Sequence, residues 1–395
     1  MDPVLSSRER VLMALNHKEP DRVPLDIGGV SQTGLHVNAY KNLIAYLHID
    51  KPVRVFDWFQ QLASIDEEVL EGFEVDTRGL SPAMFAKTDE RQDEKDDDYV
   101  HFTDRWGIRY AKPRVGGYYF DMIGHPLGGE ITRREIDAFK LPDPTEMGGD
   151  MKPIAQAWEN RSNPPAIVLE ATEGGMLEFG FWLRGFEDFY VDLGSDPGLA
   201  CYLLDKILDF KIAVWETALS QVGSSIDVAW EVDDLGLQNG PMLSPVFYKE
   251  YIKPRHQKLF SFIKSRTPKR VFVGFHSCGS IRALIPDLID AGVDALNPIQ
   301  VSAAHMDTRE LKREFGRDIT FWGGGVNTQS VLPKGTPNDV RDEVRRRIGD
   351  LAPGGGFVFA AVHNIQADVP PQNIIAMVDA LHDHGIYIHP KVGSG

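Results

Sequence analysis

A histidine and a cysteine two residues apart, His276 and Cys278, follow an apolar run at 270–275. In an extended backbone, side chains at positions i and i+2 point to the same side. Imidazole nitrogen and thiolate sulfur are both common zinc ligands, so the pair predicts a metal site where a buried strand ends. The alternative is a buried imidazole beside a small buried hydrophobic residue, which is what an isolated cysteine usually is.

The composition restricts the setting in which such a site would work. The chain has 395 residues, 42% of them hydrophobic, enough for one large domain or two ordinary ones. A net charge of -16 argues against nucleic acid or an anionic membrane surface as the main partner. We see no leader sequence and no apolar run near the roughly 20 residues of a membrane span, so we expect a soluble cytoplasmic protein. Two cysteines exclude a disulfide framework, and a reducing compartment would keep Cys278 available as a ligand.

Short apolar runs alternate with segments of helical periodicity, which predicts an α/β fold, a (β/α)8 TIM-like barrel, in a single domain over 1–395. The strands are expected at 22–27, 75–80, 166–171, 226–232, 270–275, 293–297, 319–322 and 356–361. The helices are expected at 34–47, 197–219, 245–263, 281–291, 337–351 and 370–384. Residues 87–141 break the alternation with an acidic run, an aromatic-rich stretch and the turn signal Gly116-Gly117. This segment is expected to be a β-hairpin insertion over the barrel mouth.

Polar residues follow the expected strands at their carboxyl ends, where barrels of this class carry their active sites. The catalytic candidates are Glu231, Asp233 and Asp234. The substrate-binding candidates are His36, Glu170, Glu173, Asn297 and Asn327. Each has a structural alternative. Asp233 and Asp234 can cap a turn instead of binding a ligand. Glu170 and Glu173 lie on a strand expected to be buried, where a carboxylate needs a partner or a raised pKa, and a lone histidine such as His36 seldom faces the barrel mouth.

Several segments resemble the uroporphyrinogen decarboxylase superfamily. They are residues 8–24, the His-Ser-Cys-Gly at 276–279, the Phe-Trp-Gly-Gly-Gly-Val-Asn at 321–327 and the Val-His-Asn-Ile at 362–365. The resemblance implies a distorted (β/α)8 barrel with one of two chemistries. One is cofactor-free decarboxylation of uroporphyrinogen, and the other is zinc-dependent methyl transfer between a corrinoid protein and a thiol or related acceptor.

The segment after the first strand bears on which chemistry applies. The decarboxylase branch has Arg-Gln-Ala-Gly-Arg there, whereas residues 26–34 read Asp-Ile-Gly-Gly-Val-Ser-Gln-Thr-Gly, without arginine. A site without those cations would not attract a substrate with many carboxylates. His363 favours the decarboxylase, because that branch carries a histidine at this place.

The methyltransferase branch carries His-x-Cys after strand five and a second cysteine after strand eight, all on zinc. His276 and Cys278 match the first part, and His363 stands where the second cysteine is expected. The resemblance therefore implies a zinc site of three protein ligands with an open position, with Glu231, Asp233 or Asp234 as a further ligand or as support for an imidazole.

The resemblance also implies the partners. They are a small-molecule substrate, a corrinoid such as methylcobalamin, carried by a partner protein, and a second copy of this chain in a homodimer. Phe179, Phe181, Trp182 and Tyr248 are available as an apolar wall for the macrocycle, or as ordinary core. A carboxy-lyase and a non-catalytic corrinoid-binding protein remain as alternatives.

Overall fold

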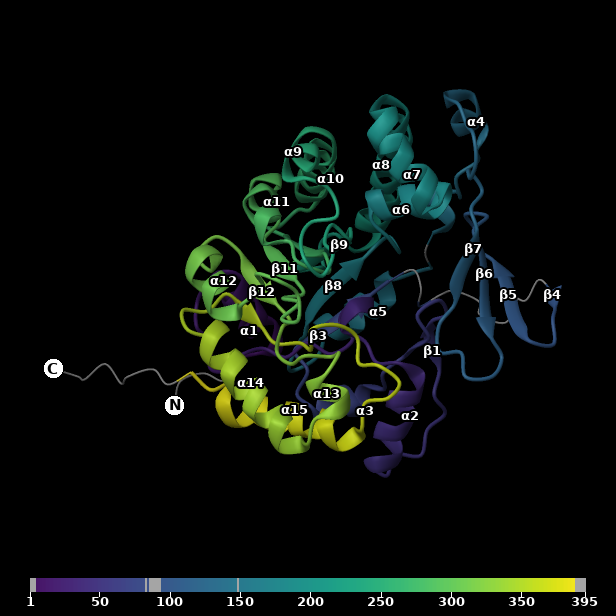
Figure 1. The fold of residues 1–395 in the computed structure, drawn as a ribbon. Helices are drawn as coiled ribbons and strands as arrows, with labels where there is room; N and C mark the ends of the chain where they lie inside the picture. The colour runs from purple at the N-terminus through teal and green to yellow at the C-terminus, as the bar shows by residue number, and fades with distance from the viewer. Residues whose placement is uncertain (1–4, 82–83, 85–93, 148, 388–395) are drawn as a thin grey trace.

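The barrel wall is a curled sheet of parallel strands, seen in a computed structural model that describes residues 5–81, 84, 94–147 and 149–387 (Figure 1). The strand order is β13-β12-β11-β10-β9-β8-β3. The strands are β3 (Thr77–Leu80), β8 (Ala166–Glu170), β9 (Val228–Val232), β10 (Phe272–His276), β11 (Ala295–Asn297), β12 (Thr320–Trp322) and β13 (Phe357–Val358). Each falls within one residue of an expected run, so the predicted barrel is confirmed.

The expected first strand, 22–27, is reduced to two isolated bridges, an antiparallel one between Arg22 and Ile386 and a parallel one between Leu25 and Phe359. Pro24 has no N–H to give to a strand ladder, and the N–H of Leu25 donates to the side chain of Asp76 (2.8 Å) instead of to a neighbouring backbone. The N–H of Asp76 donates to the carbonyl of Leu25 (2.8 Å). The prediction of a full strand was wrong, but the segment still closes the gap between β13 and β3.

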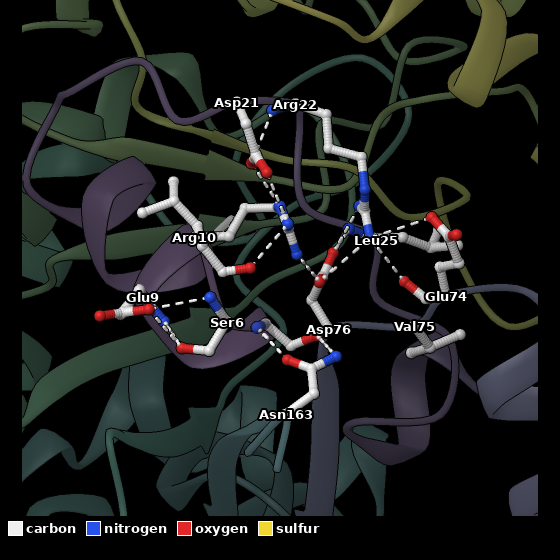
Figure 2. A network of polar contacts seen from close by, with 12 residues as sticks. Ser6, Glu9, Arg10, Asp21, Arg22, Leu25, Glu74, Val75, Asp76 and Asn163 are labelled. Carbon is white, nitrogen blue, oxygen red and sulfur yellow. Dashed lines mark hydrogen bonds and ion pairs between the residues drawn. The ribbon is translucent and has the colours of Figure 1, made fainter. Parts of the chain in front are cut away.

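Two arginines hold the Leu25 segment in place at one end of the barrel. Figure 2 shows Arg10 and Arg22 both directed at the carboxylate of Asp76, which is completely buried. The N–O distances are 2.6 Å from Arg10 and 2.7 Å from Arg22. Arg10 comes from α1 (Ser7–Leu15) and also pairs with Asp21 (2.6 Å). Because Asp76 precedes β3, this network lies at the amino-terminal end of the barrel.

Helices surround the sheet. Those expected from periodicity are α2 (Val37–Tyr46), α8 (Pro197–Val222), α10 (Lys253–Arg266), α11 (Ile285–Ala291), α14 (Pro337–Leu351) and α15 (Pro371–His384). The expected helix at 245–263 is divided into α9 (Pro245–Phe247), a wider π turn (Tyr248–Ile252) and α10. The remaining helices are α3 (Glu67–Gly72), α4 (Arg133–Ala138), α5 (Lys152–Glu159), α6 (Met176–Arg184), α7 (Phe186–Ser195), α12 (Thr308–Phe315) and α13 (Val331–Lys334). No helix in the described part of the chain is both long enough and apolar enough to cross a lipid bilayer.

Alternate residues of each strand face opposite sides of the sheet. Trp230 and Val232 of β9 pack inside the barrel with Trp322 of β12, and the two indole rings lie 5.3 Å apart. Ala229 packs outside, against the helices. The period of two therefore also directs Glu231 outward.

A second, antiparallel sheet lies beside the barrel (Figure 1). It comprises β4 (Glu94–Lys95), β5 (Tyr99–Thr103), β6 (Arg109–Pro113) and β7 (Asp121–Gly124). The expected single hairpin is thus part of a four-stranded sheet, and Gly116 occupies the β6–β7 turn with a φ of +76°. The start of the expected insertion, 87–93, lies outside the described residues. A short hairpin of β1 (Val55–Asp57) and β2 (Leu62–Ala63) precedes it in the chain.

Candidate metal centre and active-site cavity

Three nitrogen and sulfur donors meet at the carboxyl-terminal end of the barrel. His276 ends β10, Cys278 follows two residues later, and His363 comes after β13. Ligand atoms of the three lie within 4.8 Å of one another. The Sγ of Cys278 is 3.4 Å from Nε2 of His276, and the two imidazole centroids are 5.3 Å apart. The structure thus brings together the residues expected from the sequence as metal ligands.

Asn297 fixes the orientation of His276. Its amide nitrogen donates to the carbonyl of Trp322 (2.9 Å), which turns its Oδ1 toward Nδ1 of His276 (2.5 Å). His276 must therefore carry its proton on Nδ1, leaving the Nε2 lone pair directed toward Cys278. Asn297 was expected to bind substrate, but it is buried behind the imidazole and supports it.

The donor set fits zinc in spacing and in protonation. Tetrahedral zinc with a Zn–S bond of about 2.3 Å and a Zn–N bond of about 2.0 Å separates the two donors by about 3.5 Å. Burial lowers the pKa of His276 to about 4 and also lowers that of His363, so both imidazoles are neutral and have a free lone pair. Burial, with Asp234 and Glu178 nearby, raises the pKa of the Cys278 thiol, and a bound metal cation would displace that proton.

Asp234 holds the loop that carries Cys278. Its Oδ1 accepts the N–H of Cys278 (2.7 Å) and lies 3.8 Å from Nε2 of His276. Behind it, Gly279 adopts a φ of +89° and packs against the backbone of Gly236, where a Cβ would meet an atom at 2.4 Å. The two loops therefore fix each other, and Asp234 is the catalytic candidate that contacts the metal donors.

The other two catalytic candidates face away from this centre. Asp233 accepts the N–H groups of Leu177 and Glu178 at the start of α6 (both 3.0 Å) and contacts Nε2 of His256 (3.0 Å). Glu231 points outward from β9 and forms an ion pair with Lys211 of α8 (3.0 Å). Neither lines a cavity next to the donors.

The remaining candidates divide among several locations. Glu170 is buried inside the barrel, where it accepts hydrogen bonds from the backbone (3.1 Å) and hydroxyl (2.8 Å) of Ser31, and burial raises its pKa to about 7. His36 caps α2 by accepting the N–H of Asn38 (3.1 Å). Asn327 accepts two backbone N–H groups of the turn that follows it. Only Glu173 of the substrate-binding candidates lines the cavity described next.

A cavity of about 230 Å³ adjoins the donors, with His276, His363 and Asp234 in its wall. Its aromatic lining is Phe56, Trp58, Phe59, Phe102, Trp106, Tyr110, Phe179 and Trp182. Its acidic lining is Asp57, Asp104, Glu173, Glu178 and Asp234. No lysine or arginine of the described residues lines it. We call this the inner cavity.

Three segments outside the barrel strands supply most of this lining. β1 and the loop after it contribute the lining residues between Phe56 and Gln60, and β5, β6 and the turn between them contribute Phe102, Asp104, Trp106 and Tyr110. Helix α6 contributes Phe179 and Trp182. Phe181 and Tyr248, the other aromatics considered from the sequence, pack against Phe189 and His256 instead. The sequence signals for this lining were the aromatic-rich stretch of the insertion and two of the four residues considered as an apolar wall, Phe179 and Trp182.

An outer cavity of about 640 Å³ lies on the other side of the donors. Cys278 lines only this cavity, His276 lines only the inner one, and His363 lines both. Tyr118, Tyr119 and Asn327 also belong to its wall. The three donors therefore stand in the partition between two spaces.

Comparison with known proteins agrees with this architecture. Residues 132–384 match the family model described as uroporphyrinogen decarboxylase (URO-D). This chain belongs to the uroporphyrinogen decarboxylase family. All three donors and α6 lie within the match, whereas the antiparallel sheet and the loop after β1 precede it.

Individual relatives of the family are distant. The chain is similar to the uroporphyrinogen decarboxylases of Psychromonas ingrahamii (24% identical over 287 residues, 70% of this chain and 75% of the relative) and Methylococcus capsulatus (25% over 290 residues, 73% and 75%). A methyltransferase from Methanosarcina mazei shares the fold, with a TM-score of 0.62 and 18% identity over 96% of this chain and 99% of that one. Membership therefore establishes an enzyme family and its barrel, and the reaction must be argued from the site.

Proposed function

We propose that this enzyme is a zinc-dependent methyltransferase that moves a methyl group between a corrinoid and a small-molecule thiol or related acceptor. The observation that carries the proposal is the convergence of His276, Cys278 and His363, whose ligand atoms lie within 4.8 Å of one another where the inner and outer cavities adjoin. Zinc bound by three protein ligands keeps an open position and lowers the pKa of a thiol or hydroxyl that occupies it.

Residues around the donors orient the metal ligands and can take up the proton that the acceptor loses. Asn297 holds His276 in the tautomer that exposes Nε2, and Asp234 holds the backbone of Cys278. The carboxylate of Asp234 also lines the inner cavity, where it can accept the proton that an acceptor thiol loses. The aromatic walls exclude water from the nucleophile.

The two cavities suit a reaction between two reactants. The inner cavity of about 230 Å³ admits a small acceptor, whereas the outer one of about 640 Å³ is the larger. We place the acceptor in the inner cavity and the corrinoid, carried by a partner protein, at the outer one. Because His363 lines both cavities, the two spaces adjoin at the donors, where the acceptor could reach the methyl group directly.

Decarboxylation of uroporphyrinogen is the second candidate, because the curated relatives carry that name. A substrate with many carboxylates requires cationic partners, and the described lining of the inner cavity has five carboxylates without a lysine or arginine. In the segment where the decarboxylase branch carries its arginines, this chain has Asp26, which is buried and accepts hydrogen bonds from Thr77 and Trp322. The charge of the site therefore favours methyl transfer.

The proposal is tested by incubating the purified enzyme with methylcobalamin and a panel of thiols while the cobalamin spectrum is recorded. We expect demethylation by the wild type and a loss of about 100-fold or more in Cys278→Ala, since one of three ligands is gone. Cys201→Ala, which removes the other cysteine from α8, should keep full activity. Decarboxylation of uroporphyrinogen by the wild type, or full transfer by Cys278→Ala, would contradict the proposal. Retained corrinoid binding without any turnover would favour the non-catalytic alternative.

A further inference from the structure

Three acidic residues of the inner cavity lack the cationic partners that acids have elsewhere in this protein. Asp57 accepts hydrogen bonds from Gln60, and Asp104 accepts them from its own turn and from the hydroxyl of Tyr110, but all of these donors are neutral. Buried Asp76 pairs with two arginines and Glu231 pairs with Lys211. In contrast, none of Asp57, Asp104 and Glu173 forms an ion pair with a lysine or arginine of the described residues. Glu173 accepts no hydrogen bond from them either, although it is exposed to the cavity.

The acids fall into two groups at different ends of the cavity. The charge of Glu173 acts on both Asp57 and Asp104: burial raises the pKa of each to about 6, and Glu173 adds to both shifts. Glu178 and Asp234 act on Cys278 at the metal end. A positive charge bound beside the first group would relieve repulsion that the protein does not relieve with its own cations.

Aromatic rings surround the same space. Trp106 lies 4.1 Å from Phe179, centroid to centroid, and Phe179 lies 5.0 Å from Trp182. On the sheet side, Tyr110 stacks on Phe102 at 4.6 Å. Aromatic faces attract cations within about 6 Å, and rings combined with carboxylates are the usual recognition of methylated ammonium groups, whose methyls pack on the rings.

Lys112 is a cation that contacts aromatic rings near the inner cavity without lining it. Its Nζ lies 4.9 Å from the ring of Phe120 and 6.0 Å from that of Trp58, and it donates to Gln61 (3.1 Å). Lys112 does not line the inner cavity. It therefore leaves the carboxylates of the cavity without a cation.

We propose that the inner cavity binds a small thiol or alcohol that carries a methylated ammonium group. The cation lies among the aromatic rings beside Asp57, Asp104 and Glu173, and the thiol or hydroxyl points to the metal end. The assignment of the thiol end rests on the proposed function, whereas the assignment of the cationic end rests on the lining alone.

Three probes of the same shape test the charge preference. They are choline, its uncharged carbon analogue 3,3-dimethyl-1-butanol, and the anion 3,3-dimethylbutanoate. Isothermal titration calorimetry on chelator-treated enzyme at pH 7.5 should give choline an affinity about 10-fold or more above that of the neutral alcohol, with the anion weakest. Equal affinity for choline and the alcohol, preference for the anion, or no choline binding would overturn the inference.

A matched pair of variants locates the binding. Glu173→Gln removes a carboxylate from the cavity and should weaken choline binding about 3- to 10-fold without changing that of the neutral alcohol. Glu187→Gln makes the same change at an exposed position of α7 outside the cavity and should change neither. Equal effects of both variants would contradict a cation site at Glu173.

The two proposals fail separately. Choline binding is measured without metal, so a cation preference in an enzyme that binds no zinc would refute the proposed function alone. An enzyme that binds zinc and transfers methyl groups, but does not distinguish choline from the neutral alcohol, would refute the cation site alone.

Discussion

The two ends of the barrel differ in whether their acidic residues are paired with basic ones. At the amino-terminal end, Arg10 and Arg22 pair with Asp76 and tie the Leu25 segment to the barrel (Figure 2). At the carboxyl-terminal end, the inner cavity gathers five carboxylates without a lysine or arginine among its described lining residues. Charge that is paired internally stabilises the fold, whereas charge without an internal partner is available to a ligand.

The same contrast appears along a single segment of chain. Glu231 of β9 faces outward and is paired with Lys211. The carboxylate of Asp233 accepts hydrogen bonds from the start of α6 and contacts His256. Asp234, one residue further, lines the inner cavity and contacts the metal donors. Three acids within four positions thus differ in role because they differ in direction.

The largest effect should come from breaking the amino-terminal network. Asp76→Ala leaves two arginines without their buried partner and removes the acceptor of the Leu25 N–H. We expect it to lower the free energy of unfolding by about 3–5 kcal/mol, as measured by urea denaturation. Asp21→Ala, which removes the more exposed partner of Arg10, should cost about 1 kcal/mol or less. Similar losses in both variants would show that Asp76 has no special part in closing the barrel.

At the other end, removing the support of an imidazole should weaken metal binding. Asn297→Ala frees the tautomer and the ring orientation of His276, and we expect zinc affinity to fall about 10- to 100-fold in a competition with a chromophoric chelator. Asn327→Ala, whose side chain caps a turn, should leave zinc affinity unchanged. An unchanged affinity in Asn297→Ala would mean that His276 needs no support or is not a ligand.

The acidic lining should make cation binding depend on pH. Choline keeps its charge at every pH, whereas Asp57 and Asp104, with pKa values raised to about 6, become protonated below that pH. Its affinity should therefore fall about 3- to 10-fold as the pH decreases from 7.5 to 5. Asp57→Asn should flatten this profile in calorimetry, and a profile that stays steep would assign the titration to another group.

The smallest effect on stability is expected from changing Glu173, a carboxylate without an ion pair or hydrogen bond among the described residues. Glu173→Gln, without ligand, should leave the midpoint of urea unfolding unchanged or slightly higher, because it removes a like charge from beside Asp57 and Asp104. A clear decrease would indicate that Glu173 stabilises the fold as Asp76 does, and the contrast between the two ends would not hold at this position.

The sequence was sufficient for the barrel and for the pairing of His276 with Cys278 because both depend on local patterns, whereas His363 was implied as a third donor by the family resemblance. Strand runs such as 270–275 are apolar over their whole length, and the donors immediately follow two of them. The directions of Glu231 and Asp233 were not predictable in the same way, since they depend on the phase of β9 and on which helix start needs a cap. Residues 22–27 read as a strand because their apolar pattern does not show that Asp76 would take the N–H of Leu25.

The inner cavity could not be derived from the sequence. Its lining combines the loop after β1, the antiparallel sheet and α6, and no local pattern records which residues of three distant segments will meet. The aromatic-rich stretch between 99 and 119 was expected over the barrel mouth, but which of its side chains would line the cavity was not predictable. Pairing of acids with arginines likewise joins residues far apart in the sequence. That Asp76 is paired with arginines and Asp57 is not can therefore be seen only in the folded protein.

The most direct test of the central claim is the metal content of enzyme purified without chelator, measured by mass spectrometry. We expect about one zinc per chain in the wild type and in Cys201→Ala, and almost none in His276→Ala and Cys278→Ala. A wild-type enzyme without zinc, whose absorption spectrum does not change when Co(II) is added, would contradict the account.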